Sequence, residues 1–359
     1  MSEKTQTRKE QFRELINGSV PIAERRIDVA VIAGLIAVAV AMPTVAGVLM
    51  GYPGVASNVL IWMLFAVSFN LLLGYTGLLS FGHAMFLGGS MYVIAIVMTQ
   101  FGPGMIVIGI PLALALMGLL AYGIGRLIVQ KGEIYFALLT IAFGEVIWYI
   151  ANSNPGGVTG GDDGIASGLL PPLVESYRGI LTIELGSFIV SMYWAVAAVF
   201  VVATYLLFRI VRSPFGRTLI TIRENEQLAR SIGVNTRRYK VHAFMLSAVF
   251  SAVAGTMLLI VNQSVATSYL YWETSGEVVM MTIVGGLSSF AGPMFGAFLW
   301  FLGSEFLSGW QAIGALRHYW QFGFGLLFII IILVEPRKGG WGAIKKGARW
   351  AANKLLGGN

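Results

Sequence analysis

Long apolar runs recur along almost the whole chain, and they limit what it can fold into more than any other feature. A helix that crosses the hydrocarbon core of a bilayer needs about 20 mostly apolar residues. Only 11% of the residues are charged and the mean hydropathy is +0.77, whereas soluble domains carry about 25% charged residues. The sequence therefore predicts an all-α polytopic membrane protein. Ten runs are candidate spans: 28–50, 56–73, 78–100, 104–126, 134–151, 188–210, 241–262, 277–290, 293–308 and 318–335.

Lysine and arginine are unevenly distributed, which predicts the side that each loop faces. Cytoplasmic loops of membrane proteins collect basic residues. Of the 24 basic residues, 22 precede the first run, follow the fourth run, or fall within 209–240 and 337–354. Ten alternating crossings put all of these on one side, which we assign to the cytoplasm together with both termini. This sorting accounts for the net charge of +7 without a nucleic-acid partner.

The predicted spans divide the chain into three parts. Residues 1–27 form a cytoplasmic N-terminal segment with one amphipathic face, which lies on the membrane and does not read as a signal peptide. Residues 28–335 form the transmembrane domain, which includes a cytoplasmic loop at 211–240. Residues 336–359 form a basic cytoplasmic tail.

Two segments in different halves of the chain resemble each other. Residues 77–86 (GLLSFGHAMF) and 286–295 (GLSSFAGPMF) are identical at six of ten positions without a gap. Transporters built from repeats leave such traces, often at interrupted helices near the solute path. The alternative is that the small residues only allow close helix packing. The second segment follows the short run 277–290, which either spans fully or forms a broken helix.

The loop at 211–240 has internal structure of its own. Pro214 and Gly216 indicate a turn, residues 221–231 are good helix formers, and Gly233 with Asn235 supplies a C-terminal stop. A short helix at the membrane surface follows, and it favours a mechanical contact with another protein. The alternative is a solvated loop that binds only lipid headgroups.

The same loop resembles that of a known family. Residues 213–239 are similar to the cytoplasmic loop of permease subunits in branched-chain amino-acid ABC importers, particularly the LivM type. In many ABC importers this loop holds a coupling helix, with the pattern E-A-A-x-x-x-G, that docks on the ATPase. Here Ala229 and Gly233 keep the spacing of the pattern, but Gln227 replaces the leading Glu. Further segments within 58–335 are similar to the family: 70–83, 131–145, 158–165 and 276–296.

The resemblance implies the fold and the partners of an ABC importer permease. The fold would have about ten transmembrane helices, with pseudo-repeats and broken helices. The partners would be a LivH-like paralogous permease, two ATP-binding subunits and an extracytoplasmic solute-binding protein. ATP and Mg would bind to the ATPase subunits, and no cofactor to this chain. The contact with the ATPase is expected at Arg223, Glu226, Gln227, Ala229 and Gly233.

The resemblance also implies a location and a class of substrate. The chain would lie in the cytoplasmic (inner) membrane as a multi-pass protein. Its substrates would be branched-chain amino acids or similar small solutes, and the sequence does not separate these from other amino acids, urea or short amides.

Motifs for catalysis are missing from the sequence. There is no G-x-x-x-x-G-K-[ST] phosphate loop, so ATP hydrolysis requires a separate subunit. There is no cysteine, and His83, His242 and His318 are too scattered to suggest a metal site or a nucleophile. We therefore predict a transport subunit that is not itself an enzyme.

A few polar residues lie inside the apolar runs and are candidates for the solute path. An ionisable side chain in a membrane is costly and is kept where it faces protein or water. Glu145 lies inside the fifth run near Thr140, and Ser80 and His83 lie in a break after the second run. Each has a structural alternative, with Glu145 as a hydrogen-bonding partner and His83 as an interfacial residue. The alternative function is a stand-alone secondary transporter or channel that uses Glu145 as its ion or proton site.

The loops on the opposite side are mainly acidic, with Arg178 and Arg317 as their cations. Complementary charges orient protein partners, so these arginines are candidates for docking a solute-binding protein. The glycine-rich run 152–164 predicts a flexible external loop, which serves as an outer gate, a docking surface or a plain connection.

Overall fold

The computed structural model describes residues 23–49, 54–166 and 192–309, with single residues between 322 and 329. Every regular element in these ranges is a helix, and the isolated β-bridge found there joins Ile165 to Val265. The prediction of an all-α fold is confirmed. The segment 1–22, the basic tail, Arg178 and Arg317 lie outside the described residues.

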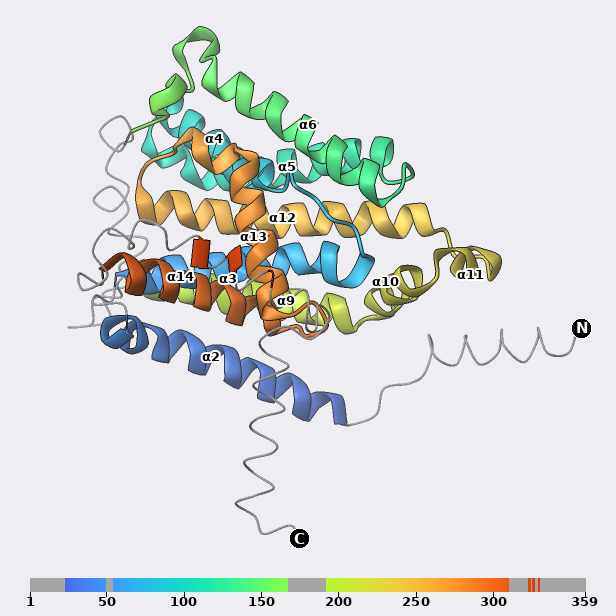
Figure 1. The fold of residues 1–359 in the computed structure, drawn as a ribbon. Helices are drawn as coiled ribbons and strands as arrows, with labels where there is room; N and C mark the ends of the chain where they lie inside the picture. Colours follow the sequence, from blue (N-terminus) through green and yellow to red (C-terminus); the bar gives the residue numbers. More distant parts are fainter. Residues whose placement is uncertain are drawn as a thin grey trace, which may run out of the picture.

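Seven helices within the described ranges are long and apolar enough to cross a membrane. Their axes run in roughly the same direction, so that they form a bundle (Figure 1). The prediction of a polytopic membrane protein is thereby confirmed. The seven are α2 (Ala23–Leu49), α3 (Val55–Thr76), α4 (Ala84–Phe101), α5 (Ile106–Ile128, after η1, Pro103–Met105), α6 (Glu133–Asn152), α9 (Met192–Arg212) and α12 (Thr236–Asn262).

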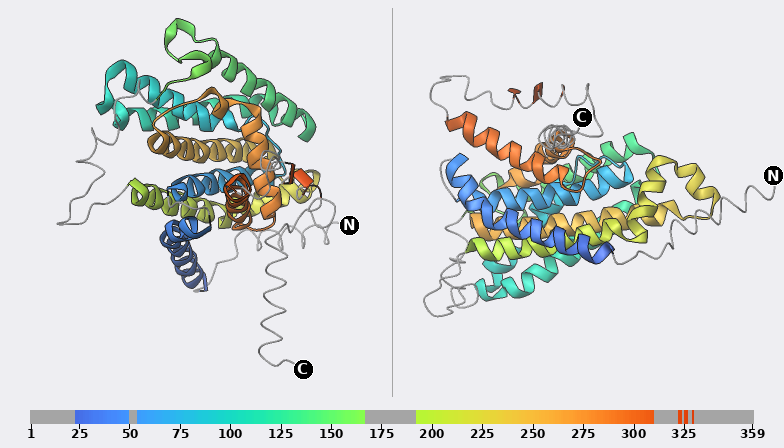
Figure 2. Two further views of the ribbon diagram at one scale, coloured as in Figure 1. Left: turned by 60° about the vertical axis from the view of Figure 1, so that its left-hand side comes forward. Right: turned by 90° about the horizontal axis from the view of Figure 1, so that it is seen from below.

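The region of the last three candidate spans, 277–335, differs from a series of simple crossings. α13 (Trp272–Gly285) has 14 residues and lies across the bundle at a steep angle to its neighbours (Figures 1 and 2). It is too short to span a bilayer by itself. α14 (Gly292–Gly309) follows and packs on α13 and α3. Because most of run 318–335 lies outside the described residues, ten spans stay a prediction.

α3 occupies the centre of the bundle. Eighteen of its 22 residues are buried, and it contacts α9, α12, α13 and α14. It is apolar all round, as a helix that is covered on every side must be. In α2 and α6, by contrast, only 22% of the apolar window is buried. These two helices therefore form the rim of the described bundle.

The described basic segments gather at one end of the bundle. The start of α2, the turn between α5 and α6, α10 (Pro214–Glu224) and α11 (Glu226–Ser231) lie there (Figures 1 and 2). Arg209 pairs with Asp28 at 2.7 Å, and Arg237 donates to the carbonyl of Arg126 at 2.8 Å. We call this end, formed by the start of α2 and by residues 126–132 and 209–240, the basic end. The sequence predicted that these segments lie on one side of the membrane, and their position at one end of the bundle agrees with this. That this side is the cytoplasm stays a prediction.

The glycine-rich segment after α6 lies at the opposite end and is held by hydrogen bonds. The Oδ1 of Asn154 accepts from the backbone amides of Thr159 and Gly160 at 2.9 and 3.1 Å. The β-bridge of Ile165 with Val265 ties the segment to the chain after α12. Where the sequence predicted a flexible loop, the structure shows a turn anchored at both its ends.

Candidate functional site

Both helix breaks begin at a glycine with a positive φ. α3 is followed by Gly77, with φ +77°, whose amide donates to the carbonyl of Leu73. α13 is followed by Gly286, with φ +107°, whose amide donates to the carbonyl of Thr282. Each glycine is the first residue of one of the two similar decapeptides. Glycine adopts positive φ without the penalty that a Cβ brings. Both decapeptides therefore start at a helix end and lead to α4 or α14, but ψ is 6° at Gly77 and 120° at Gly286, so the two links follow different courses.

The first break runs back into the bundle. The chain after α3 turns from the basic end toward the middle, where α4 begins (Figure 1). Gly82 packs so closely on α6 that a Cβ there would lie 1.8 Å from the carbonyl oxygen of Thr140. The backbone amide of Ala84, at the start of α4, donates to Oγ of Ser275 on α13 at 2.8 Å. The start of α4 is therefore bonded to the oblique helix α13.

The second break packs against α3. A Cβ on Gly74 would lie 3.0 Å from the carbonyl oxygen of Leu287 and 2.1 Å from Oδ1 of Asn70. The absence of a side chain at Gly74 thus allows the second break to approach α3. We call the unit formed by residues 70–84 and 275–292 the break region.

His83 is a buried core residue. Its side chain has no exposed surface, and its Nε2 lies 2.9 Å from Oγ of Ser247. The same hydroxyl donates to the carbonyl of Ser68 at 2.6 Å. Because a hydroxyl has a single proton, Nε2 must carry hydrogen and donate to Ser247. Aromatic rings surround the imidazole, with centroids at 5.3–6.2 Å: Phe65, Phe69, Phe86 and Phe244. These contacts place His83 within the core and not at a membrane interface, and its Nδ1 has no hydrogen-bond partner among the described residues.

The other three candidates for the solute path lie around the first break and along α6. Ser80 is buried, and its hydroxyl has no hydrogen-bond partner among the described residues. Thr140 is buried and donates to the carbonyl of Ala137 at 2.7 Å. Glu145 is half-buried, and its Oε1 also lacks a partner in the described ranges. Burying a polar atom without a partner costs about 1–3 kcal/mol. A solute or water that hydrogen-bonds to Ser80 or Glu145 would remove this cost.

Sequence reasoning missed several polar residues of the break region and its surroundings. Asn70 is fully buried, and neither atom of its amide has a partner in the part of the chain described. Ser68 contacts Ser251 at 2.9 Å between the two hydroxyl oxygens, which links α3 to α12. Each of these is a polar residue inside an apolar run, and that signal was available in the sequence. Its use would have required knowing which helices are neighbours.

The predicted coupling loop consists of two short helices. Sequence reasoning expected a turn at Pro214 and one helix at 221–231, whereas Pro214 lies in the first turn of α10, where its missing amide is tolerated. The helical region is divided at Asn225, whose Oδ1 accepts from the amide of Leu228 at 2.9 Å and caps α11. Gly233, with φ +91°, follows α11 as predicted. Asn235 caps the start of α12 and is not part of the stop.

Glu226 is bound within this loop. Its carboxylate lies 2.7 Å from Nη2 of Arg230 and 2.8 Å from Nζ of Lys240, whose side chain is only 8% exposed. Burial raises the pKa of Glu226, but hydrogen bonds from Lys240 and Arg230 outweigh it, so that the pKa lies below its usual value of 4.5. The pair with Lys240 joins α11 to the start of α12, and the pair with Arg230 lies within α11. Glu226 therefore supports the shape of the loop.

The other residues expected at an ATPase contact point in different directions. Ala229 is buried, and Arg223 turns inward to donate to the carbonyl of Gly74 on α3. Gln227 and Gly233 are exposed, and Leu228 between them has 51% of its surface exposed. Gln227 and Leu228 are thus exposed on α11 together with Arg230 and Ser231, and we call the pair Gln227 and Leu228 the α11 face.

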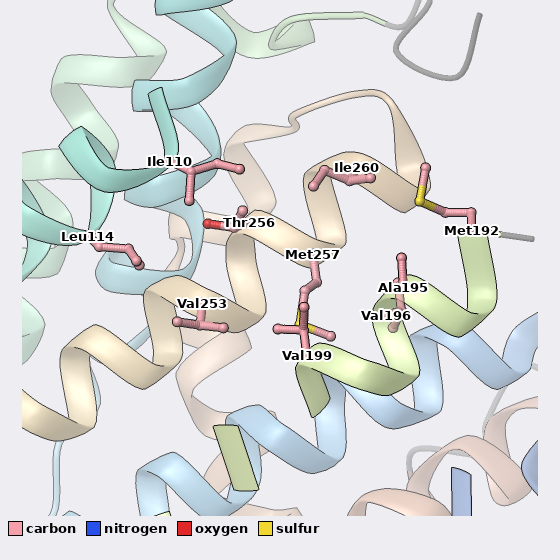
Figure 3. Close-up of a pocket in the computed structure, with 10 residues that line it drawn as sticks. All are labelled: Ile110, Leu114, Met192, Ala195, Val196, Val199, Val253, Thr256, Met257 and Ile260. Carbon is pink, nitrogen blue, oxygen red and sulfur yellow. The ribbon is translucent and has the colours of Figure 1, made fainter. Parts of the chain in front are cut away.

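An apolar cavity of about 400 Å³ lies between α5, α9 and α12 (Figure 3). Its lining includes Leu114, Val199 and Met257. The hydroxyl of Thr256, which also lines the cavity, donates to the carbonyl of Ala252 at 2.9 Å and is therefore satisfied. Burying a zwitterion without partners for its charges is prohibitively costly. This cavity does not fit an amino acid.

Comparison with known proteins identifies the chain. Residues 52–332 match the family described as branched-chain amino acid transport system, permease component. That range contains both helix breaks as well as α10 and α11. The chain belongs to this family. The permease is therefore the membrane component of a transport system, and the LivM-type resemblance is confirmed.

Individual relatives support the same assignment. The permease is 24% identical over 323 residues to the high-affinity branched-chain amino acid transport system permease protein LivM of Escherichia coli (strain K12), with 84% of this chain and 72% of that protein covered. The corresponding LivM of Salmonella typhimurium is 24% identical over 318 residues with the same coverage. The probable branched-chain amino acid transport permease protein LivM of Methanocaldococcus jannaschii is 21% identical over 331 residues, with 78% and 91% covered. No solved structure matches the chain.

Proposed function

We propose that this permease and a second, LivH-like permease together enclose the path by which branched-chain amino acids or similar small solutes enter the cell. Separate ATPase subunits supply the energy. The observation that carries this proposal is the family match across 52–332, which includes the break region and the two helices at the basic end.

We place the ATPase contact at the α11 face. Leu228 and Gln227 are exposed on a short capped helix at the basic end, and an exposed apolar side chain is a suitable anchor for a groove on a partner. The basic end faces the cytoplasm in this proposal, which is where two ATP-binding subunits would bind ATP and Mg. Arg223 and Glu226 would act from within the permease.

We place the solute path beside the break region. Interrupted helices near the middle of a membrane are a recurring way to build solute sites, because they leave polar groups away from water. Ser80 and Glu145 have such unpaired groups here. The opposite end of the bundle, with the exposed Asp162 and Asp163, would receive a solute-binding protein, together with Arg178 and Arg317.

Co-purification in mild detergent tests this assembly. We expect the permease to be recovered with a second permease and two ATPase subunits, and the complex to hydrolyse ATP faster when solute-loaded binding protein is added. Transport by the permease in vesicles without any ATPase would contradict the proposal. It would favour a stand-alone transporter that uses Glu145.

Competition between solutes for the companion binding protein tests the substrate class. Leucine, isoleucine and valine are expected to compete with one another more strongly than urea or short amides do. The reverse order would assign the permease to a different solute.

A further inference from the structure

Arg223 caps the end of a helix to which it does not belong. Its Nη1 donates to the carbonyl of Gly74, in the last turn of α3. The last four carbonyls of a helix have no intrahelical partner, and the amide of Leu78 that would otherwise bond to Gly74 bonds instead to Oγ1 of Thr76 at 3.3 Å. A cation at this position also interacts favourably with the helix dipole. Arg223 thus satisfies an otherwise unpaired carbonyl at the end of the central helix α3.

The capped residue is also the contact point of the second break. Gly74 faces the carbonyl of Leu287 on one side and receives Arg223 on the other. The stem of Arg223 packs close to Gly77, since a Cβ on Gly77 would lie 3.2 Å from Cγ of Arg223. One side chain of α10 therefore contacts the start of the first break and the residue that supports the second.

The first break continues this connection to α13. It leads from Gly77 to Ala84, whose amide bonds to Ser275 on α13, and α13 ends at the second break. The contacts form a closed loop through Arg223, the end of α3, the start of α4, and α13. Packed elements of this kind move together because their interiors are dense.

We propose that Arg223 is a positioning residue that links α10 and α11 to both helix breaks through the end of α3. This inference rests on the proposed binding of an ATPase at the α11 face. When the ATPase moves α10 and α11, Arg223 displaces the last turn of α3, and Gly74 and Ser275 carry the displacement to the links before α14 and α4.

The assembled complex with Arg223→Gln tests this role. The side chain of Arg223 is only 23% exposed and points into the permease, so binding of the ATPase subunits is expected to be unchanged. Solute transported per ATP hydrolysed is expected to fall about tenfold, which is within the usual range for coupling between distant sites. Arg223→Lys keeps a cation and a donor and should recover most of the coupling. Lys131→Gln, which removes an exposed cation at the basic end, serves as the control and should have no effect.

The possible outcomes separate this inference from the proposed function. Normal coupling in Arg223→Gln would overturn the inference, and so would loss of ATPase binding, because Arg223 would then belong to the docking surface. Failure of the unchanged permease to bind an ATPase would overturn the proposed function itself.

A second measurement does not depend on the folding of an Arg223 variant. The chain has no cysteine, so Ser288→Cys places a single thiol at an exposed position of the second break. The rate at which a water-soluble maleimide modifies this thiol is expected to differ between ATP-bound and ATP-free complexes. Equal rates would contradict the inference. In the Arg223→Gln background the difference is expected to disappear.

Discussion

At the scale of single residues, the most informative groups are polar side chains inside the bundle. His83 donates to Ser247, which donates to the carbonyl of Ser68, and this chain joins α4, α12 and α3. A buried hydrogen bond contributes little net stability, but the loss of one partner leaves the other unsatisfied. These side chains hold neighbouring helices in one register.

Replacement of Ser247 by alanine tests the hydrogen-bonded chain. Nε2 of His83 would lose its partner and the carbonyl of Ser68 its bond from outside α3, so we expect destabilisation by about 1–3 kcal/mol, measured as a lower midpoint of thermal unfolding in detergent. Ser153→Ala is the matched control, because the Ser153 hydroxyl bonds to the carbonyl of Ile150 at an exposed site. Equal effects of the two substitutions would argue against a buried network.

The carboxylate of Glu226 predicts a dependence on pH. Its pKa is held below the usual 4.5 by Lys240 and Arg230, which outweigh the effect of burial. A group with a lowered pKa in the folded state contributes stability above its ordinary pKa and loses it as the pH falls through the lower value. The difference in unfolding midpoint between wild type and Glu226→Gln should therefore be constant from pH 7 to about 5 and shrink below about 4.5. A difference that grows on acidification would show that the ion pairs do not set this pKa.

At the scale of elements, the loop at the basic end is shaped by its helix caps. Asn225 ends α10 and caps α11, Gly233 follows α11 with a positive φ, and Asn235 caps α12. Each cap depends on a side chain or a backbone conformation that few other residues supply. The orientation of the α11 face is therefore sensitive to these positions.

Gly233→Pro tests the importance of that orientation. Proline fixes φ near −65°, which is incompatible with φ +91° at this position. We expect membrane insertion to be retained and ATPase stimulation by solute-loaded binding protein to be abolished. Gly233→Ala provides a graded comparison, since a Cβ there meets no atom within 4 Å and adds only backbone strain. Normal stimulation in the proline variant would rule out the proposed contact at the α11 face.

At the scale of the whole molecule, the bundle contains two kinds of helix: long ones, and ones that follow a break or lie between the two breaks. The long helices α2, α3, α5, α6, α9 and α12 are regular, whereas α4 and α14 each begin after a break and α13 lies obliquely between them. α13 contacts α3, α4, α6 and α14. A small movement of this short helix therefore acts on both helices that follow a break, α4 and α14, and on α3 and α6. That geometry suits a protein that alternates between two arrangements.

Glu145→Gln tests whether α6 contributes to the path. Glu145 directly follows Gly144, which packs on Gly82 of the first break, and its buried Oε1 is unpaired within the described residues. If Glu145 contacts solute or water in the path, the substitution should lower transport several-fold more than it lowers the amount of protein in the membrane. Tyr149→Phe, at an exposed position on the same helix, should change neither. Equal losses of transport and of protein would indicate a structural residue.

The sequence by itself determined the helical class, the grouping of basic segments at one end, the first helix break and the family, and it left open whether run 277–290 spans fully or is broken. These follow from local properties: apolar length, the placement of lysine and arginine, and small residues that interrupt an apolar run. Tertiary structure decided the directions of the side chains. Arg223 and Gly74 are 149 positions apart, and His83 and Ser247 are 164 apart. Whether a polar residue faces a partner, a solute or the core depends on which helices become neighbours, and neither hydropathy nor spacing along the chain contains that information.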